Sequence, residues 1–230
     1  MKPMPVLRTW TCSALLCACP IAQAGRPMVV DDATILDPGN CQLEAWLQHA
    51  PQQREHWAMP SCRAGAWELG IGLGRIDPEA SAAYGARQLQ AKTIFRPLRT
   101  NGWGIGLTVA DQYRPGGGLS GDISALVPLS VSLLDDRVLV HANAGWLHRQ
   151  GGRGAATWAL GTEWTAASGL ALTLESYGQQ HGRAWVQAGM RIDAVPGRLA
   201  LDAGIGQRFG LRSAAPYFTI GLTVAAPLLR

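Results

Sequence analysis

The residues of this chain that could do chemistry are polar side chains set at alternate positions within apolar stretches. They are Glu44, Glu68, Gln88, Gln90, Lys92, His141, Asn143, Glu163, Glu175, Gln187, Arg191 and Asp202. Alternate positions of a strand share one face. An unpaired buried charge is costly, so mixed signs on an enclosed face predict a paired, hydrogen-bonded structural network. A ligand path built from the same groups is the alternative interpretation.

Hydrolysis is the catalytic chemistry that these residue types could support. His141 with Glu163, or His148 and His181 in predicted loops, are the candidate bases. The sequence has no Gly-x-Ser-x-Gly motif, and no serine has an evident histidine partner. We therefore expect no catalytic residues, no cofactor and no metal site, with an outer-membrane lipid hydrolase as a disfavoured alternative.

The elements that must position these side chains are short strands. Residues 102–111 show the pattern, because Trp103, Ile105, Leu107 and Val109 alternate with small or polar residues. Such stretches recur about every 15 to 20 residues, the spacing of barrel strands and their turns. They are residues 67–73, 89–95, 102–111, 123–131, 138–146, 158–164, 170–174, 186–192, 199–205 and 218–224. With one hairpin before them, they predict an all-β, single up-and-down antiparallel transmembrane β-barrel of about 12 strands.

The composition agrees with a barrel. The 230 residues are 47% hydrophobic and only 16% charged. After the N-terminus, no run reaches the roughly 18 apolar residues that a membrane helix requires. In a barrel only alternate residues meet lipid, so the average looks neutral. The formal net charge is +4, and no basic cluster suggests a nucleic-acid partner.

The connections between predicted strands alternate in length. Predicted short turns are residues 97–101, 134–136, 166–168 and 194–197, and predicted longer loops are residues 76–83, 112–119, 148–154, 178–183 and 210–216. Outer-membrane barrels have short periplasmic turns and longer extracellular loops. This pattern predicts a periplasmic N-terminus.

Tryptophan placement supports the same orientation, because aromatic rings concentrate at membrane–water interfaces. Five tryptophans form a predicted lipid-facing aromatic belt. Trp67, Trp103 and Trp164 lie near the periplasmic ends, and Trp146 and Trp158 lie near the outer ends. A sixth, Trp185, falls on the inner face, and the pattern gives no reason for it.

Two cysteines remain outside the first 24 residues. Antiparallel partners share a constant sum of residue numbers, so Cys41 and Cys62 oppose each other if the turn is centred on Pro51-Gln52. Opposed strand residues approach closely enough for disulfide geometry. Since the chain is predicted to be exported, we expect a Cys41–Cys62 disulfide rather than two free thiols or metal ligands.

Three segments are predicted along the chain. Residues 1–24 form a signal peptide with Lys2 and Arg8 before an apolar stretch and a small-residue cleavage site at its end. Lipoprotein processing at Cys19 is the alternative. Residues 25–39 form a periplasmic N-terminal segment, and residues 40–230 form the barrel, in the outer membrane of a Gram-negative cell.

Glycines form rows on the predicted inner face of three strands. The rows are Gly70, Gly72 and Gly74, then Gly104 and Gly106, then Gly204 and Gly206. Missing side chains could open a lumen, seat the N-terminal segment, or supply the bending that barrel closure requires. The sequence leaves these three interpretations open.

The start of the predicted mature chain resembles a family of proteobacterial outer-membrane β-barrels. The resemblance rests on Arg26-Pro27, Asp31-Asp32-Ala33, and Gly39 followed by Gln42-Leu43-Glu44. Some members of that family are associated with the degradation of phenol and other aromatic compounds, as transport proteins. The family's last strand usually ends in an aromatic residue, which this chain lacks. We interpret Asp31 and Asp32 themselves as part of a solvated periplasmic lead-in.

The expected function is passive passage or binding of small, apolar or aromatic molecules. The expected partners are outer-membrane lipid or lipopolysaccharide and such a solute. A structural or surface-binding envelope protein without transport is the alternative.

Overall fold

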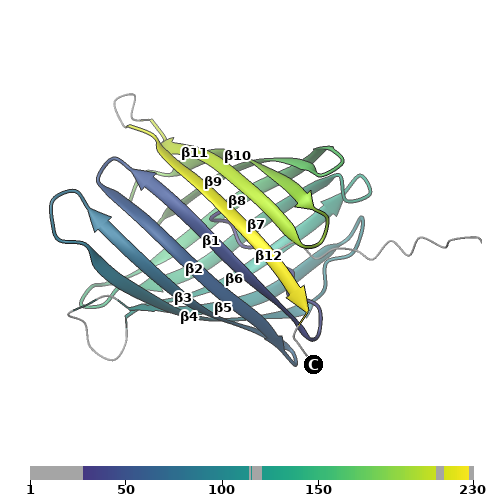
Figure 1. Cartoon of the computed structure of the whole chain (residues 1–230), viewed down its shortest axis with the longest axis horizontal. Helices are drawn as coiled ribbons and strands as arrows, with labels where there is room; N and C mark the ends of the chain where they lie inside the picture. Colours follow the sequence, from purple (N-terminus) through teal and green to yellow (C-terminus); the bar gives the residue numbers. More distant parts are fainter. Residues whose placement is uncertain (1–27, 114, 116–120, 211–214, 228–230) are drawn as a thin grey trace, which may run out of the picture.

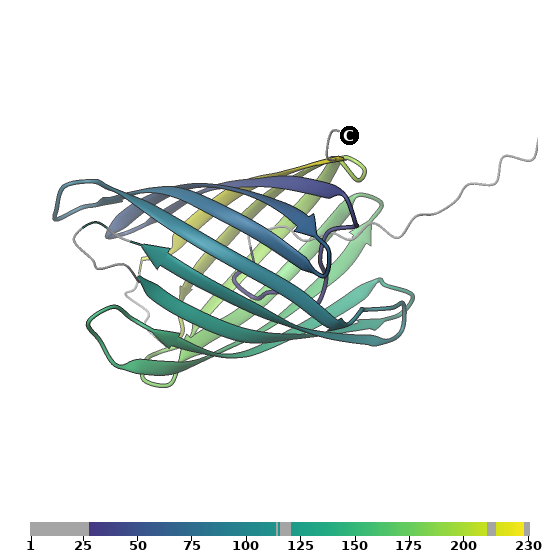
Figure 2. The ribbon, with the colours of Figure 1, turned by 90° about the horizontal axis from the view of Figure 1, so that it is seen from below.

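The computed structural model describes residues 28–113, 115, 121–210 and 215–227. These residues form one closed barrel in which each strand pairs with its sequence neighbours, and the first strand pairs with the last (Figures 1 and 2). The twelve strands are β1 (Asn40–Ala50), β2 (Gln53–Ala64), β3 (Trp67–Pro78), β4 (Tyr84–Arg96), β5 (Trp103–Tyr113), β6 (Asp122–Leu133), β7 (Val138–His148), β8 (Gly154–Ala167), β9 (Leu170–Gln179), β10 (Trp185–Val195), β11 (Leu199–Arg208) and β12 (Tyr217–Pro227). Every pairing is antiparallel, as in β1–β2 and β10–β11. The predicted all-β barrel is confirmed.

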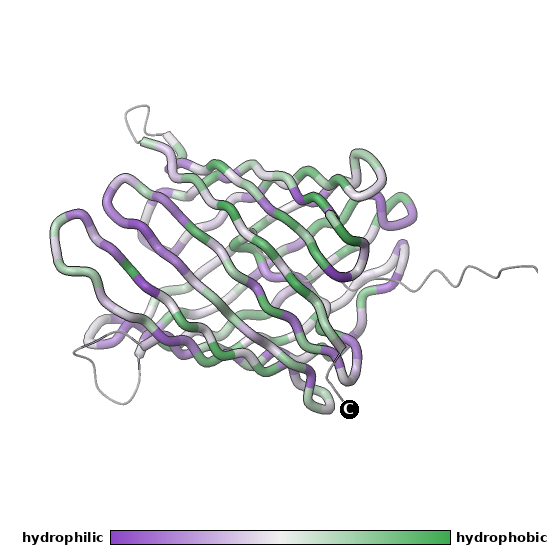
Figure 3. The backbone as a smooth tube through the Cα atoms, viewed as in Figure 1, coloured by the Kyte–Doolittle hydropathy of each residue, from purple (hydrophilic) through white to green (hydrophobic). Residues whose placement is uncertain are grey.

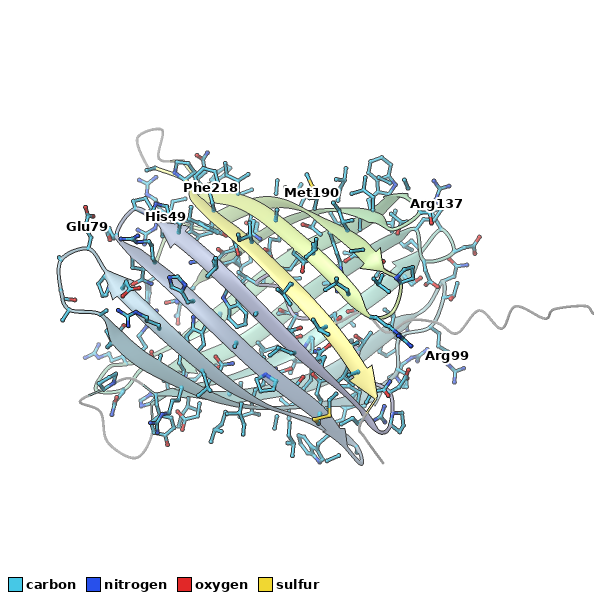
Figure 4. The ribbon with its side chains drawn as sticks, in the orientation of Figure 1. His49, Glu79, Arg99, Arg137, Met190 and Phe218 are labelled. Carbon is cyan, nitrogen blue, oxygen red and sulfur yellow. A yellow bond between two sulfur atoms is a disulfide. The ribbon has the colours of Figure 1, made fainter. Side chains whose placement is uncertain are left out.

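Period-two alternation explains how the chain forms these strands. Apolar side chains at alternate positions are exposed on the outside of the barrel, for example Ile71, Leu89 and Leu160. Apolar and polar residues accordingly alternate along the strands in Figure 3. In Figure 4, Met190 and Phe218 point away from the barrel wall. Among the described residues, no helix is long and apolar enough to cross a membrane.

The connections follow the predicted alternation with two departures. One end of the barrel carries the connections at residues 65–66, 97–102, 134–137, 168–169 and 196–198. The other end carries the remaining connections, of which those described in full are residues 51–52, 79–83, 149–153 and 180–184. The first hairpin turn is shorter than the other connections at its end, and residues 97–102 are longer than the others at theirs. We call these the short-turn end and the long-loop end; Figure 4 labels Arg99 and Arg137 at the former and Glu79 at the latter.

The first hairpin has the predicted register. Cys41 pairs with Cys62 across β1 and β2, and the turn is centred on Pro51 and Gln52. The two cysteines form a disulfide with Cα atoms 4.0 Å apart, visible as the yellow bond in Figure 4. The predicted disulfide is therefore confirmed, and it ties the two strands together at the short-turn end.

The glycine rows have a different role on each strand. A Cβ atom on Gly74 would lie 2.6 Å from the ring of Trp57, and one on Gly206 would lie 2.5 Å from the ring of Tyr217. Aromatic rings therefore occupy the space over these two glycines. A Cβ atom on Gly106 would lie 2.5 Å from the carbonyl oxygen of Thr93, beside the irregularity in the β4–β5 register. This close backbone approach matches the bending interpretation.

Candidate functional site

Residues 28–36 lie inside the barrel, and we call them the lumen segment. Figures 1 and 2 show this purple stretch within the ring of strands before β1 begins. Ala33 is fully buried, and Val30 and Leu36 are almost fully buried. The interpretation of Asp31 and Asp32 as a solvated lead-in is therefore wrong. Strand alternation cannot reveal this placement, because the segment forms no strand and its partners are distant in sequence.

The beginning of the lumen segment is held by a carboxylate on β9. Glu175 accepts hydrogen bonds from the backbone N–H groups of Val29, at 2.8 Å and 3.0 Å, and of Val30, at 2.9 Å. On β7, Asn143 makes a reciprocal pair with Asp31. The Asp31 N–H donates to Asn143 Oδ1 at 2.7 Å, and Asn143 Nδ2 donates to the Asp31 carbonyl at 2.8 Å.

The end of the segment is held on the opposite part of the wall. The Leu36 N–H donates to Glu68 Oε2 on β3 at 3.0 Å, and Arg63 Nη1 on β2 donates to the Leu36 carbonyl at 2.8 Å. Side chains of the barrel thus replace the backbone partners that a strand would have found in a sheet. Because buried backbone groups need partners, these contacts fix the segment in one position.

A cluster of charges joins the middle of the segment to β4 and β5. Lys92 Nζ lies 2.7 Å from Asp31 Oδ1 and 2.7 Å from Asp32 Oδ1. Thr108 donates its hydroxyl to Asp31 Oδ2 at 2.6 Å. Burial raises the pKa of Asp32, but Lys92, with a smaller effect from His141, more than offsets this and holds that pKa below its ordinary value. The Lys92 side chain is only 4% exposed, so its ammonium group depends on these two carboxylates for its charge balance.

Apolar packing adds to the polar contacts. Met28 and Val30 pack against Ala159 on β8, with Tyr177 beside them. A Cβ atom on Gly161 would lie 2.7 Å from Met28 Cε and 2.8 Å from Val30 Cγ1. The glycine that seats the lumen segment is therefore Gly161, which belongs to none of the rows identified in the sequence.

Ser130 and His141 form a serine–histidine pair, which the sequence analysis did not find. They are register partners on β6 and β7, and Ser130 Oγ lies 2.7 Å from His141 Nδ1. The predicted turn at residues 134–136 would have opposed Ser130 to Val140, and the contact follows only because the turn in the structure is one residue longer. The Ser130 hydroxyl is fully buried and also accepts a hydrogen bond from the Ala33 N–H at 2.8 Å. The pair therefore anchors the segment and presents no accessible nucleophile. Within the described residues, no hydrogen bond joins His141 to Glu163.

The other polar residues singled out in the sequence lie around this site. Glu68 also accepts a hydrogen bond from Ser61 at 3.0 Å, and Gln42 reaches both Glu68 and Glu44, at 3.5 Å and 3.3 Å. Gln88 donates to Gln90 at 3.2 Å. These contacts join neighbouring inner-face side chains into a network.

The opposite wall holds a second charged group. Arg191 Nε lies 3.9 Å from Asp202 Oδ1 across the β10–β11 ladder and 3.8 Å from Asp193 Oδ1. Gln187 accepts a hydrogen bond from the Tyr217 hydroxyl. Glu163 is paired in register with Thr173, on β8 and β9.

Aromatic residues line the lumen toward the long-loop end. We call them the lumen aromatics: Trp46, Trp57, Tyr84, Tyr177, Trp185 and Tyr217. Trp46 and Trp57 stack with ring centroids 5.8 Å apart, and Tyr84 packs beside them. The rings of Trp185 and Tyr217 pack in a T-shaped arrangement with their centroids 5.4 Å apart, which accounts for the inward position of Trp185. Inner-face parity, applied to every aromatic residue, would have identified this group.

The tryptophans of the predicted aromatic belt lie on the outer face of the barrel. All five are exposed: Trp67, Trp103, Trp146, Trp158 and Trp164. Arg96 lies over the ring of Trp103, with its guanidinium carbon 3.9 Å from the ring centroid. In the part of the chain that the structure describes, no group of three or more metal-ligating side chains is assembled.

A family comparison identifies the chain. The sequence model of one protein family matches residues 13–226. The chain belongs to the family described as Uncharacterised conserved protein UCP029691. Among curated proteins, no match was found.

Solved structures of similar fold are named as porins or as an outer membrane channel. The structure titled KdgM porin has a TM-score of 0.65 and 8% identity, covering 80% of this chain and 98% of its own. The NanC porin has a TM-score of 0.59 and 10% identity, covering 80% and 98%. The COG4313 outer membrane channel from Pseudomonas putida F1 has a TM-score of 0.59 and 12% identity, covering 85% and 98%. At these identities the likeness shows that this family member shares their barrel fold.

Proposed function

We propose that this protein is an outer-membrane channel for passive passage of small apolar or aromatic molecules, and that the lumen segment is its plug. The observation that carries the proposal is the arrangement inside the barrel. Side chains of the barrel hold a non-strand segment across the lumen, and aromatic rings line the lumen toward the long-loop end. Aromatic faces offer contact area to apolar solutes while their polar edges remain hydrated.

The proposed location follows from the outer surface. An exposed face rich in leucine, isoleucine and valine requires lipid around it, and tryptophans lie near both ends of the strands. The predicted signal peptide, which lies outside the described residues, is consistent with export. The similar structures named above are called porins or outer membrane channels, which supports an outer-membrane location for this chain.

The choice of solute rests on two observations. The residue motif near the start of the predicted mature chain resembles that of barrels associated with the degradation of aromatic compounds. The lumen aromatics supply a matching chemistry on the path that a solute would take from the long-loop end. No step in this proposal makes or breaks a covalent bond.

The test combines conductance in planar bilayers with uptake of small aromatic solutes into proteoliposomes. Wild type is compared with a plug variant, Asp31→Asn with Asp32→Asn, and with an aromatic variant, Trp46→Ala with Trp57→Ala. We expect the plug variant to raise ion conductance and uptake. We expect the aromatic variant to lower uptake of aromatic solutes while leaving ion conductance close to that of wild type.

A structural or surface-binding envelope protein is the second candidate function. The extent of the anchoring favours it, because strands β2 to β9 all contact the lumen segment. If neither wild type nor the plug variant conducts ions or admits solute, although both are folded barrels, the channel is excluded and this candidate stands.

A further inference from the structure

The outer surface of β11, β12, β1, β2 and β3 carries an apolar groove of about 710 Å³. Its side chains come from two register rows. One row reads Leu201, Leu222, Ala45, Ala58 and Leu73, and the next contains Ile220, Leu47, His56 and Arg75. These nine positions have outward parity, and the other five lining residues, Asp202, Gly221, Trp46, Trp57 and Gly74, form the inward-parity row between them. Outward rows flank that row on both sides, so the groove opens on the outer face of the barrel wall. We call it the outer groove.

The shape of the outer groove has a simple cause. Ala45 and Ala58 are small side chains paired side by side at its centre, between Leu222 on one side and Leu73 on the other. Missing side-chain volume at two adjacent positions makes the floor, and the flanking leucines make the walls. With strands about 4.8 Å apart, five neighbouring strands span about 19 Å, so several acyl chains could lie there side by side.

Basic side chains gather at one end of the groove. His56 and Arg75 line it, and they are register partners on β2 and β3. Arg54 and Arg87 are exposed on the same outward face, and Figure 4 shows His49 at the same, long-loop end of the barrel. These five residues form what we call the basic rim.

Three acidic residues lie near the basic rim, and one of them, Asp111 on β5, is hydrogen-bonded to Tyr113, the register partner of Arg87. Asp77 lies 3.1 Å from Arg75 and 3.8 Å from His56. Glu79 follows the end of β3, beyond the rim. The rim thus has three arginines and two histidines against three carboxylates, and its guanidinium and imidazole N–H groups offer hydrogen-bond donors to an anionic headgroup.

We propose that the outer groove and the basic rim bind one molecule of lipopolysaccharide through its lipid A. Its phosphates would contact Arg75, Arg87 and His56, and its acyl chains would lie over Ala45 and Ala58. Arginine pairs well with phosphate because its guanidinium group presents parallel N–H donors. The choice of lipid A rests on the proposed outer-membrane orientation, in which the long-loop end faces the cell exterior and the lipopolysaccharide leaflet.

Native mass spectrometry of the full mature protein, with purified lipid A added, tests this site. The headgroup variant is Arg75→Gln with Arg87→Gln, and the groove variant is Ala58→Leu. Matched controls are Arg137→Gln, an exposed arginine at the short-turn end, and Ala142→Leu, an outward alanine between Leu129 and Leu160. We expect one bound lipid A on wild type and controls, and about tenfold weaker binding for both site variants.

Two results would overturn the proposal. One is equal lipid A binding by wild type and by site variants that keep heat-modifiable mobility, which reports a folded barrel. The other is equally tight binding of phosphatidylglycerol, which would show a general phospholipid site. Conductance separates this site from the proposed channel, because none of these substitutions touches the lumen. Weaker lipid A binding with unchanged conductance would support the lipid site independently of the proposed channel.

Discussion

Lys92 and Asp32 lie 60 residues apart in sequence, yet their ammonium and carboxylate groups are 2.7 Å apart inside the barrel. The same ammonium group contacts Asp31. One cation on β4 therefore balances two neighbouring carboxylates of the lumen segment, and this contact offers a direct way to test whether the segment is a plug.

Replacing Lys92 should release the lumen segment. Lys92→Met leaves two carboxylates without their cation, and breaking a buried pair in this way costs about 3–5 kcal/mol. In the proposed plug role the segment leaves the lumen while the strands remain paired, so much of that cost should appear as weaker binding of the segment in the lumen. Higher single-channel conductance than wild type is the expected result.

The compensating variant gives the control for Lys92. Adding Asp31→Asn and Asp32→Asn to Lys92→Met removes the unbalanced charges, so the thermal stability of the barrel should recover relative to the single variant. Failure to recover any stability would mean that Lys92 acts through packing and not through its charge.

Glu175 should be needed to hold the beginning of the segment. In Glu175→Gln one carboxylate oxygen becomes an N–H₂ donor that faces the donating backbone of Val29 and Val30. Loss of charged hydrogen bonds should weaken the local contact by about 1.5–3 kcal/mol. A cysteine introduced by Val29→Cys should then react faster with a thiol reagent. Glu163→Gln on neighbouring β8 should leave that rate unchanged, and equal rates in both backgrounds would contradict the assigned role.

A side chain added at Gly161 should displace the lumen segment. In Gly161→Val the new side chain collides with Met28 and Val30, so the segment must move and conductance should rise. Gly70→Ala is a control for the loss of an inner-face glycine, because its Cβ atom would make ordinary contacts at 3.4 Å or more. If Gly161→Val conducts like wild type, the segment does not limit passage.

The Cys41–Cys62 disulfide should stabilise the first hairpin. It closes a loop with a sequence separation of 21, for which the chain-entropy model gives about 3 kcal/mol. The double variant Cys41→Ala with Cys62→Ala should therefore unfold at lower urea concentration. In unreduced, denatured mature protein an alkylating reagent should label neither Cys41 nor Cys62. Labelling of both cysteines would contradict the disulfide.

Period-two alternation was enough to predict the barrel wall. Stretches such as residues 123–131 and 186–192 lie inside single strands of the structure. A strand's two faces are set by local geometry, so the pattern can be read without knowing the partner strand. The Cys41–Cys62 pairing was predictable for a related reason, since a short turn fixes the register of a hairpin.

Which residues occupy the lumen is determined only by the tertiary structure. Asp31, Lys92 and Ser130 come from distant parts of the chain, and no periodicity links a non-strand segment to the wall it will contact. Closure of twelve strands creates an enclosed space in which backbone N–H groups and charges must find partners. The sequence determined which side chains face that space, and closure decided that the lumen segment would occupy it, because only there do Glu175, Lys92 and Glu68 surround one short stretch of backbone.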